Sequence, residues 1–445
     1  MKSGSLVARF SSTLAVLAFA CLTAFAQEVK DEPDKDPKAD RKRTPKEIVK
    51  LRMQLFAKME DIELQRTYQR AMRKHDMLPQ LQNECRQFYE AAPDKPLGIY
   101  IHSRALDDTA KRKELLDKLV ALDPKHPWPH VDFGEIALDA KDSELAAKHF
   151  AKAEELAPES AGLFREIAGE YQRRNMPTQA IEWFEKAVKL DPAHVATLEA
   201  LMTLCNTVER FQRVIELAAK LVEINPRNAW YWNMYGYGLH RTEKRPEAAE
   251  KYLKALEVSP KYGMPAYNLG LLSFDTGDFE TAAGWFRKST EWDPRYQSGW
   301  HKLIHILFKR QENYEEARKA CMRALEYFPT DIWTCKVLST SLKELKYESE
   351  AIVYWEVVSI LTRCGVMTGV LEDLFEEGPT LTRGDDVAPA VEKLPLEHLE
   401  LLAKLMPAVC KEVASSEKIL LRASALRDDV NRALQKKKEA AGEQK

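Results

Sequence analysis

Two histidines stand at a spacing that could hold a metal ion. His301 and His305 are four residues apart, so they share one face if the segment is a helix. Such a pair can bind zinc, but only Lys302, Leu303 and Ile304 lie between them. The glutamate that acts as general base in a metalloprotease helix is therefore missing. We interpret the two histidines as exposed polar side chains and expect no metal site.

The cysteines give no metal-binding pattern either. Six of the seven follow residue 26, at Cys85, Cys205, Cys321, Cys335, Cys364 and Cys410. None of these spacings matches a zinc site. The chain also has no Ser/His/Asp order, no glycine-rich phosphate loop and no paired-carboxylate motif. The sequence therefore predicts a protein that is not an enzyme and binds no cofactor.

Charge excludes some classes of partner. The 67 basic and 69 acidic residues nearly cancel, giving a formal net charge of −2. No overall field would attract nucleic acid or an anionic membrane. Glycine is scarce, and no segment has the alternating pattern of a strand. The acidic residues mainly occupy the polar faces of amphipathic helices, so an all-α protein is expected.

A regular interval organises the helices that carry these residues. Seven prolines follow one another at intervals of 34 residues five times and then 35, at Pro124, Pro158, Pro192, Pro226, Pro260, Pro294 and Pro329. A fixed period of this size indicates stacked supersecondary units.

Each period contains two helices. In residues 161–194, apolar side chains recur three or four positions apart in both halves, which places them on one face of each helix. Asn175 and Pro177 separate the halves, where a turn and a helix start are needed. Pro192 ends the second helix, because the residue before a proline is disfavoured in the helical conformation.

Small and bulky residues alternate where the two helices cross. In residues 263–296 the pattern is carried by Leu269, Gly270, Ala282, Phe286 and Pro294. These units resemble tetratricopeptide repeats. The resemblance implies a right-handed α-solenoid of helix–turn–helix repeats with helical caps. Residues 195–228 depart from the pattern, and residues 332–365 lack the closing proline. Residues 297–331 contain one extra residue near Gln311–Asn313, which we place in the turn.

The pattern divides the chain into seven segments. We expect a signal peptide (1–26), a charged disordered spacer (27–43), a divergent N-terminal helical cap (44–92), a repeat solenoid (93–365), a loop-rich linker (366–395), a C-terminal helical cap (396–436) and a disordered tail (437–445). The cap at 44–92 should contain one long helix to about Met77 and another over 79–92. The repeats are expected near 93–126, 127–160, 161–194, 195–228, 229–262, 263–296, 297–331 and 332–365.

The first 26 residues combine a basic start, an apolar run from Leu14 to Ala26 and small residues at the end, which is typical of a secretory signal cleaved near Ala26. A membrane anchor is the alternative, but the run is short for a span. A third reading is lipidation of Cys21, since the residues before it are similar to a bacterial lipobox. We therefore expect a secreted, periplasmic or cell-envelope protein.

The resemblance also implies a binding surface, because first helices of such repeats line a concave groove. Between Trp230 and Lys343 this surface combines aromatic, amide and basic side chains. The candidate residues are Trp230, Asn233, Tyr237, Arg241, Tyr267, Asn268, Phe274, His301, Lys302, His305, Lys309 and Lys336. Aromatic residues and arginine dominate many interfaces, although these rings could instead pack against neighbouring helices. By contrast, residues 127–160 offer an acidic surface that includes Asp132 and Glu135.

The same register places Cys321 and Cys335 on adjacent helices. In an oxidising compartment they could form a disulfide, and otherwise they would be small buried apolar residues.

Three functions remain open. We favour a scaffold or adaptor that binds a protein or peptide, with acidic segments preferred and no nucleic acid. The first alternative is an envelope assembly or secretion factor that is attached to a membrane through a lipidated Cys21, without an integral span. The second is a glycan or peptidoglycan binder, in which Trp230, Tyr237 and Tyr267 stack on sugars.

Overall fold

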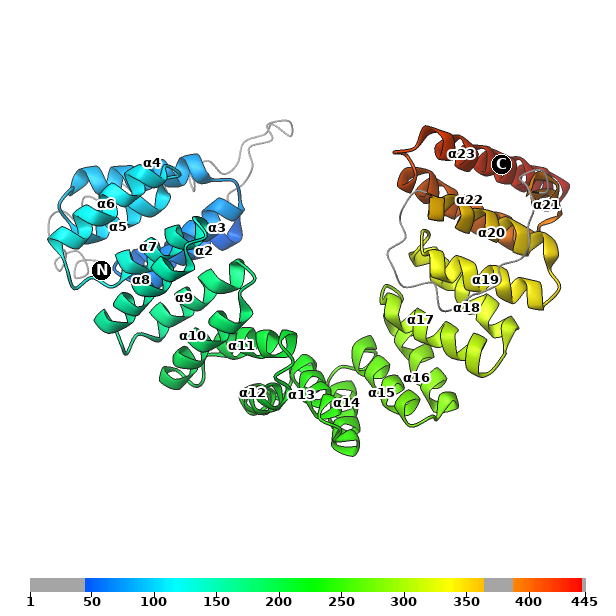
Figure 1. Ribbon diagram of the computed structural model, residues 1–445, viewed down its shortest axis with the longest axis horizontal. Helices are drawn as coiled ribbons and strands as arrows, with labels where there is room; N and C mark the ends of the chain where they lie inside the picture. The colour runs from blue at the N-terminus through cyan, green and yellow to red at the C-terminus, as the bar shows by residue number, and fades with distance from the viewer. Residues whose placement is uncertain (1–44, 364–386, 442–445) are drawn as a thin grey trace, which may run out of the picture. The chain divides into compact units, whose positions relative to one another are not determined.

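The computed structural model describes residues 45–363 and 387–441, apart from the side chains of Phe56, Arg363 and Lys418. The predicted signal peptide, spacer and Cys21, together with Cys364 and much of the predicted linker, lie outside these residues. Within them all regular structure is helical, which confirms the all-α fold (Figure 1). The helices form two compact units, Met1–Glu209 and Arg210–Lys445.

The described part of the first unit contains helices α2 to α11. Their bounds are α2 (Lys46–Ala57), α3 (Ile62–Lys74), α4 (Leu78–Ala91), α5 (Pro96–Ala105), α6 (Thr109–Leu122), α7 (Trp128–Asp139), α8 (Ser143–Leu156), α9 (Ala161–Arg173), α10 (Pro177–Leu190) and α11 (Val195–Thr207). From α5 to α10, successive helices pair as the first and second helices of the predicted repeats.

The described part of the second unit contains helices α12 to α23. Their bounds are α12 (Phe211–Ile224), α13 (Ala229–Arg241), α14 (Arg245–Val258), α15 (Gly263–Asp275), α16 (Phe279–Trp292), α17 (Gln297–His305), η2 (Ile306–Arg310), α18 (Tyr314–Tyr327), α19 (Ile332–Glu344), α20 (Glu348–Arg363), α21 (Val387–Lys393), α22 (Leu396–Glu412) and α23 (Glu417–Ala440).

One turn geometry closes the first helix of seven predicted repeats, from residues 127–160 to 332–365. A residue with positive φ recurs at the period of the prolines, at Lys141, Asn175, Glu209, Glu243, Gly277, Glu312 and Lys346. In the turn after α9, the amide of Met176 donates to the carbonyl of Tyr171 at 3.0 Å. Such a bond uses a carbonyl that the helix end leaves without a partner. The turn expected at Asn175 is therefore present.

The expected small and bulky residues meet where paired helices cross. A Cβ atom on Gly270 of α15 would lie 2.7 Å from the ring of Phe286 on α16. Gly236 stands at the same distance from Tyr252, and Gly134 is as tightly covered by Phe150. Each glycine is thus required because the ring of the second helix occupies the space of a side chain.

The extra residue of 297–331 was assigned to the wrong place. It lies in the first helix, where α17 continues as the π-helix η2, and not in the turn near Gln311–Asn313. The amide of Gln311 donates to the carbonyl of Ile306 at 3.0 Å, across five residues. A π-turn absorbs one additional residue while most of the helical hydrogen bonds are kept.

The N-terminal cap also differs from expectation, because the predicted long helix is two helices. α2 ends at Ala57, and α3 begins after Asp61, whose carboxylate accepts from the amide of Leu64 at 3.0 Å. Side-chain capping of this kind favours a new helix start over continuation. The helices α2, α3 and α4 share an apolar cluster with α5, which includes Met72, Leu81 and Ile101.

A fully buried arginine joins α3 to the repeats of the first unit. Arg66 forms ion pairs with Asp132 of α7 at 3.3 Å and with Glu166 and Glu170 of α9 at 2.9 and 3.4 Å. Burial alone would raise the pKa of Glu166, but Arg66 and Arg70 outweigh it and lower the pKa to about 2.

The C-terminal helices pack on the last repeat. α21, α22 and α23 all contact α20, and α22 also contacts α18. The predicted linker was partly wrong, since α21 is helical and buries Ala390 and Val391. The predicted tail was partly wrong too, because α23 continues to Ala440. Among the described helices, none is both long and apolar enough to cross a membrane.

The disulfide expectation is corrected by the structure. Cys321 on α18 and Cys335 on α19 are both fully buried free thiols, and burial raises the pKa of each. We expect neither to react with an alkylating reagent in the native protein, because a buried, protonated thiol is a poor nucleophile. After denaturation without reductant, mass spectrometry should find both alkylated. A Cys321–Cys335 cross-linked peptide in unreduced protein would contradict this assignment.

His398 provides a pH-dependent contact between α22 and α20. Its Nδ1 lies 3.2 Å from the hydroxyl of buried Tyr354, and burial lowers the pKa of His398 to about 4, with Glu397 opposing and Arg318 assisting the shift. The unfolded chain takes up the proton near pH 6.5, whereas the folded chain does so only near pH 4. Stability is therefore lost as pH falls through this window, by about 2 kcal/mol at pH 5.

Thermal unfolding of the wild type and of His398→Gln at pH 7.5 and 5.0 tests this contribution. The variant should lose less stability on acidification, since it has no imidazole to protonate. Equal losses in the two proteins would show that His398 is not responsible.

Candidate partner-binding groove

The twelve candidate residues lie in the second unit, on the first helices of four successive repeats. α13 carries Trp230, Asn233, Tyr237 and Arg241; α15 carries Tyr267, Asn268 and Phe274; α17 and η2 carry His301, Lys302, His305 and Lys309; α19 carries Lys336. α13, α15, α17 and α19 follow one another along the unit (Figure 1). We call the face that these residues form the predicted groove surface.

The two amides connect helices and are not free to contact a partner. Asn233 and Asn268 are 1% and 5% exposed. Nδ2 of Asn268 donates to Oδ1 of Asn233 at 2.9 Å, and Nδ2 of Asn233 lies 3.3 Å from the sulfur of Met264. A buried amide needs such partners, because an unsatisfied polar group in the interior is destabilising. The pair therefore fixes α15 against α13 beneath the predicted groove surface.

The aromatic candidates are partly buried. The ring of Tyr267 lies 5.4 Å from that of Phe286 and 5.0 Å, edge-on, from that of Tyr296. Burial raises the pKa of Tyr267 to about 12. Trp230, Tyr237 and Phe274 are likewise half-buried. Each of these rings is therefore partly covered by neighbouring side chains and partly accessible.

Cations lie over aromatic rings along this surface. Nζ of Lys302 on α17 is 5.1 Å from the ring centre of Phe274 on α15. The guanidinium of Arg241 is 4.2 Å from the ring centre of Phe211 on α12, and it donates to the hydroxyl of Tyr237 at 3.0 Å. A cation held over a ring is attracted by the negative π-face and loses part of its side-chain freedom.

The histidine pair lies in this basic surface. Burial, followed by Lys302, Arg310 and Lys309, lowers the pKa of His305. His301 is paired with Asp331 at 2.6 Å and packs against Trp333 at 4.6 Å between ring centres. In the described ranges no three His, Cys, Asp or Glu side chains are grouped to hold a metal ion.

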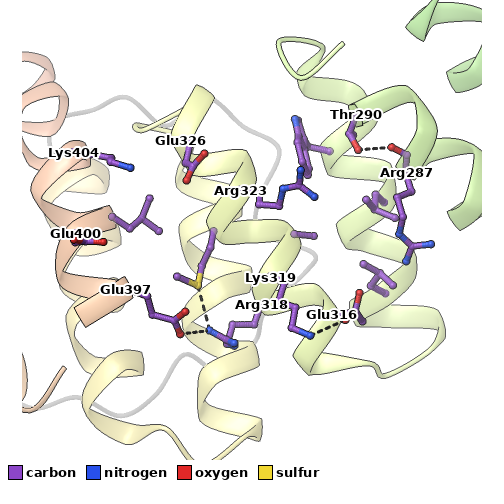
Figure 2. Close-up of a pocket in the computed structure, with 16 residues that line it drawn as sticks. Arg287, Thr290, Glu316, Arg318, Lys319, Arg323, Glu326, Glu397, Glu400 and Lys404 are labelled. Carbon is purple, nitrogen blue, oxygen red and sulfur yellow. Dashed lines mark hydrogen bonds and ion pairs between the residues drawn. The ribbon is translucent and has the colours of Figure 1, made fainter. Parts of the chain in front are cut away.

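Sequence reasoning missed a cavity on the second helices. It has a volume of about 470 Å³ and lies between α16, α17, α18 and α22 (Figure 2). Its lining carries charges of both signs, and some of them are paired: Arg318 of α18 binds Glu397 of α22 at 3.0 Å, and Lys319 binds Glu316 of the same helix at 3.0 Å. Such pairing leaves no convergent charge of one sign, so we assign no ligand to the cavity. α22 lies outside the repeat pattern, so no sequence signal placed it beside α18.

Comparison with known families decides the identity of the repeats. Family models described as "Tetratricopeptide repeat" match residues 210–296 and 166–194. The chain contains tetratricopeptide repeats. These matches include α10 with part of α9, and α12 to α16, where Gly236 meets Tyr252 and Gly270 meets Phe286. The recognition from sequence is thereby confirmed.

Curated relatives match short parts of this chain. The peroxisomal targeting signal receptor of Kluyveromyces lactis is 30% identical over 112 residues, which are 25% of this chain and 20% of the receptor. The receptor of Saccharomyces cerevisiae is 28% identical over 97 residues, which are 21% of this chain and 16% of that receptor. Human tetratricopeptide repeat protein 7B is 26% identical over 145 residues, which are 30% of this chain and 17% of the human protein. The chain thus spans a fifth or less of the length of these relatives.

Solved structures are similar only at low identity. YrrB, titled "a TPR protein with an unusual peptide-binding site", is 20% identical with a TM-score of 0.35, covering 42% of this chain and 97% of its own. PilW, a "widely conserved type IV pilus biogenesis factor", is 19% identical with a TM-score of 0.37. The match covers 46% of this chain and 94% of PilW. Tetratricopeptide repeats generally act as scaffolds that bind proteins or peptides, and scaffold families of this kind are generally not enzymatic.

Proposed function

We propose that this protein is a secreted or periplasmic scaffold, and that its predicted groove surface binds an acidic segment of another protein. The observation that carries the proposal is the set of cations that lie over aromatic rings on two first helices of this unit, with Arg241 on α13, and Lys302 and Lys309 on α17 and its continuation η2. Family membership supports peptide or protein binding, and relatives named as targeting signal receptors are consistent with it.

The preference for acidic segments follows from the local charges. Burial lowers the pKa of His305, and Lys302, Arg310 and Lys309 lower it further, so these cations add positive potential at the junction of α17 and η2. Burial also lowers the pKa of Lys336 on the next first helix. A carboxylate would be attracted to this positively charged region.

The location is part of the same proposal and rests on residues 1–26, which lie outside the described structure. The basic start and short apolar run support a cleaved signal. N-terminal sequencing of the mature protein should begin at Gln27 if cleavage follows Ala26. Incorporation of a labelled fatty acid that depends on Cys21 would instead support a lipid-anchored envelope factor.

Removing one ring and one cation tests the groove. Tyr267→Ala combined with Lys302→Ala should reduce capture of partners from the native extracellular or envelope fraction by at least about tenfold, since aromatic and basic anchors dominate interfaces. The matched control is Lys288→Ala, because Lys288 also lies over a ring, 4.2 Å from the centre of Trp285, but on the second helix α16. Circular dichroism confirms that each variant is folded.

Unchanged capture by the double variant, or equal loss in the control, would reject the groove assignment. Salt separates the glycan alternative: capture by charge should weaken as salt is raised, whereas stacking of sugars on rings should change little.

A further inference from the structure

The helix α3 lies where the repeat pattern would place a ligand. Its Arg66 reaches three first helices at once, with bonds to Tyr100 of α5 at 2.6 Å and ion pairs to Asp132 of α7 and Glu166 of α9. Its guanidinium also lies 5.4 Å from the ring centre of Trp128. First helices carry the binding surface in this family, so α3 covers part of that surface in the first unit (Figure 1).

Three side chains, one helical turn apart, make the contact with α9. Glu63 pairs with Arg165 at 3.0 Å, Arg66 with Glu166 at 2.9 Å, and Arg70 with Glu166 at 2.6 Å. The carboxylate of Glu63 rests against Gly162, in space that any Cβ on Gly162 would fill. The fit is therefore one of shape as well as charge.

The two faces of α3 are held by different forces. Tyr68, Ala71 and Met72 belong to the apolar cluster formed with α2, α4 and α5. Toward α7 and α9, the contacts described above are ion pairs and one cation–π contact. Burial of apolar surface is strongly stabilising, whereas the attraction in a buried ion pair is largely offset by desolvation. The contact with α7 and α9 is therefore specific without being strongly stabilising.

The surface beneath α3 can persist without it. Arg104 of α5 and Arg112 of α6 both pair with Asp132, and Arg112 also binds Glu135 at 2.9 Å. Glu170 is paired with Arg174 of its own helix at 2.9 Å. By contrast, the ion pairs described for Glu166 both come from α3. Departure of α3 would thus expose Glu166 while the other carboxylates keep their partners.

We propose that α3 is an intramolecular ligand of the face of α7 and α9, and that it excludes a partner whose arginine-bearing helix docks there. The partner helix would carry a glutamate one turn before an arginine and a second arginine one turn after it, as α3 does with Glu63, Arg66 and Arg70. This site differs from the predicted groove surface of α13 to α19, and it takes a segment of opposite charge.

The test uses the full-length protein and a fluorescein-labelled synthetic peptide with the sequence of residues 60–77. In the wild type α3 competes for the site, so the peptide should bind weakly. Arg66→Gln removes the central ion pairs of α3 and leaves the site intact, so the peptide should bind at least about tenfold more tightly by fluorescence anisotropy. A peptide with glutamine in place of both Arg66 and Arg70 should not show this gain.

A second variant keeps the experiment decisive if Arg66→Gln does not fold. Glu63→Lys with Arg70→Glu reverses two partly exposed charges of α3, keeps Arg66 and leaves α7 and α9 unchanged. It should also gain peptide affinity, and adding Glu166→Gln should remove the gain. Folded variants that bind the peptide no more tightly than the wild type would overturn the proposal.

Discussion

Replacing Arg66 with methionine is expected to weaken the attachment of α3 to α7 and α9 by about 3–5 kcal/mol, the usual cost of removing one partner from a buried ion pair. Arg66 is fully buried and faces Asp132, Glu166 and Glu170. Methionine retains the length of the side chain but none of its donors. The carboxylates would then lack their central cation unless α3 moves away and lets water reach them.

Hydrogen exchange of the α3 amides measures this change, because local opening reports the free energy that holds a segment in place. The matched control is Arg70→Met, one turn along the same helix. Arg70 is 39% exposed at its side chain and shares Glu166 with Arg66, so its loss should cost less than about 1 kcal/mol. If hydrogen exchange accelerated equally in the two variants, the buried Arg66 would hold α3 in place no more strongly than the partly exposed Arg70.

The repeats could be predicted from sequence because their causes are local and recur. Pro192 ends a helix and Pro177 begins one through their own backbone geometry, and the 34-residue period aligns these effects along the chain. The pairing of Gly270 with Phe286 follows from the same period, since both positions repeat. The 35-residue interval at the end of the series revealed the extra residue of 297–331. Its position in η2 could not be predicted, because a π-turn leaves no distinct residue pattern.

The contacts of α3 could not be predicted in this way. Arg66 and Glu166 are 100 residues apart, and each taken alone resembles any charged residue on an amphipathic helix. Only the folded chain shows that both are buried. The acidic character of residues 127–160 was visible, yet nothing in the sequence indicated that part of the chain itself would neutralise it.

The predicted groove surface was only partly described by sequence. The family register placed its twelve residues on the expected first helices, but register alone does not tell which side chains stay accessible. Asn233 and Asn268 hydrogen-bond each other because their helices lie close enough for direct contact. Arg241 and Lys309 are exposed, so these cations are the stronger candidates for contact with a partner.

Replacing Phe286 with alanine is expected to destabilise the second unit by about 3–5 kcal/mol, the usual cost of truncating a buried aromatic ring. Phe286 is fully buried, and its ring fills the space over Gly270 where α15 and α16 cross. Because glycine cannot fill the cavity, the two helices could close it only by moving together. Urea unfolding followed by circular dichroism measures the loss, and Phe286→Leu should cost less than about 1.5 kcal/mol.

The same substitution links packing to binding. The ring of Tyr267 on the predicted groove surface packs on Phe286, so the cavity removes the support of one proposed anchor. We therefore expect Phe286→Ala to reduce partner capture under conditions in which the protein remains folded, and Phe286→Leu to retain most of it. If alanine at this position lowered stability but left capture unchanged, Tyr267 would not depend on the crossing of α15 and α16 for its role.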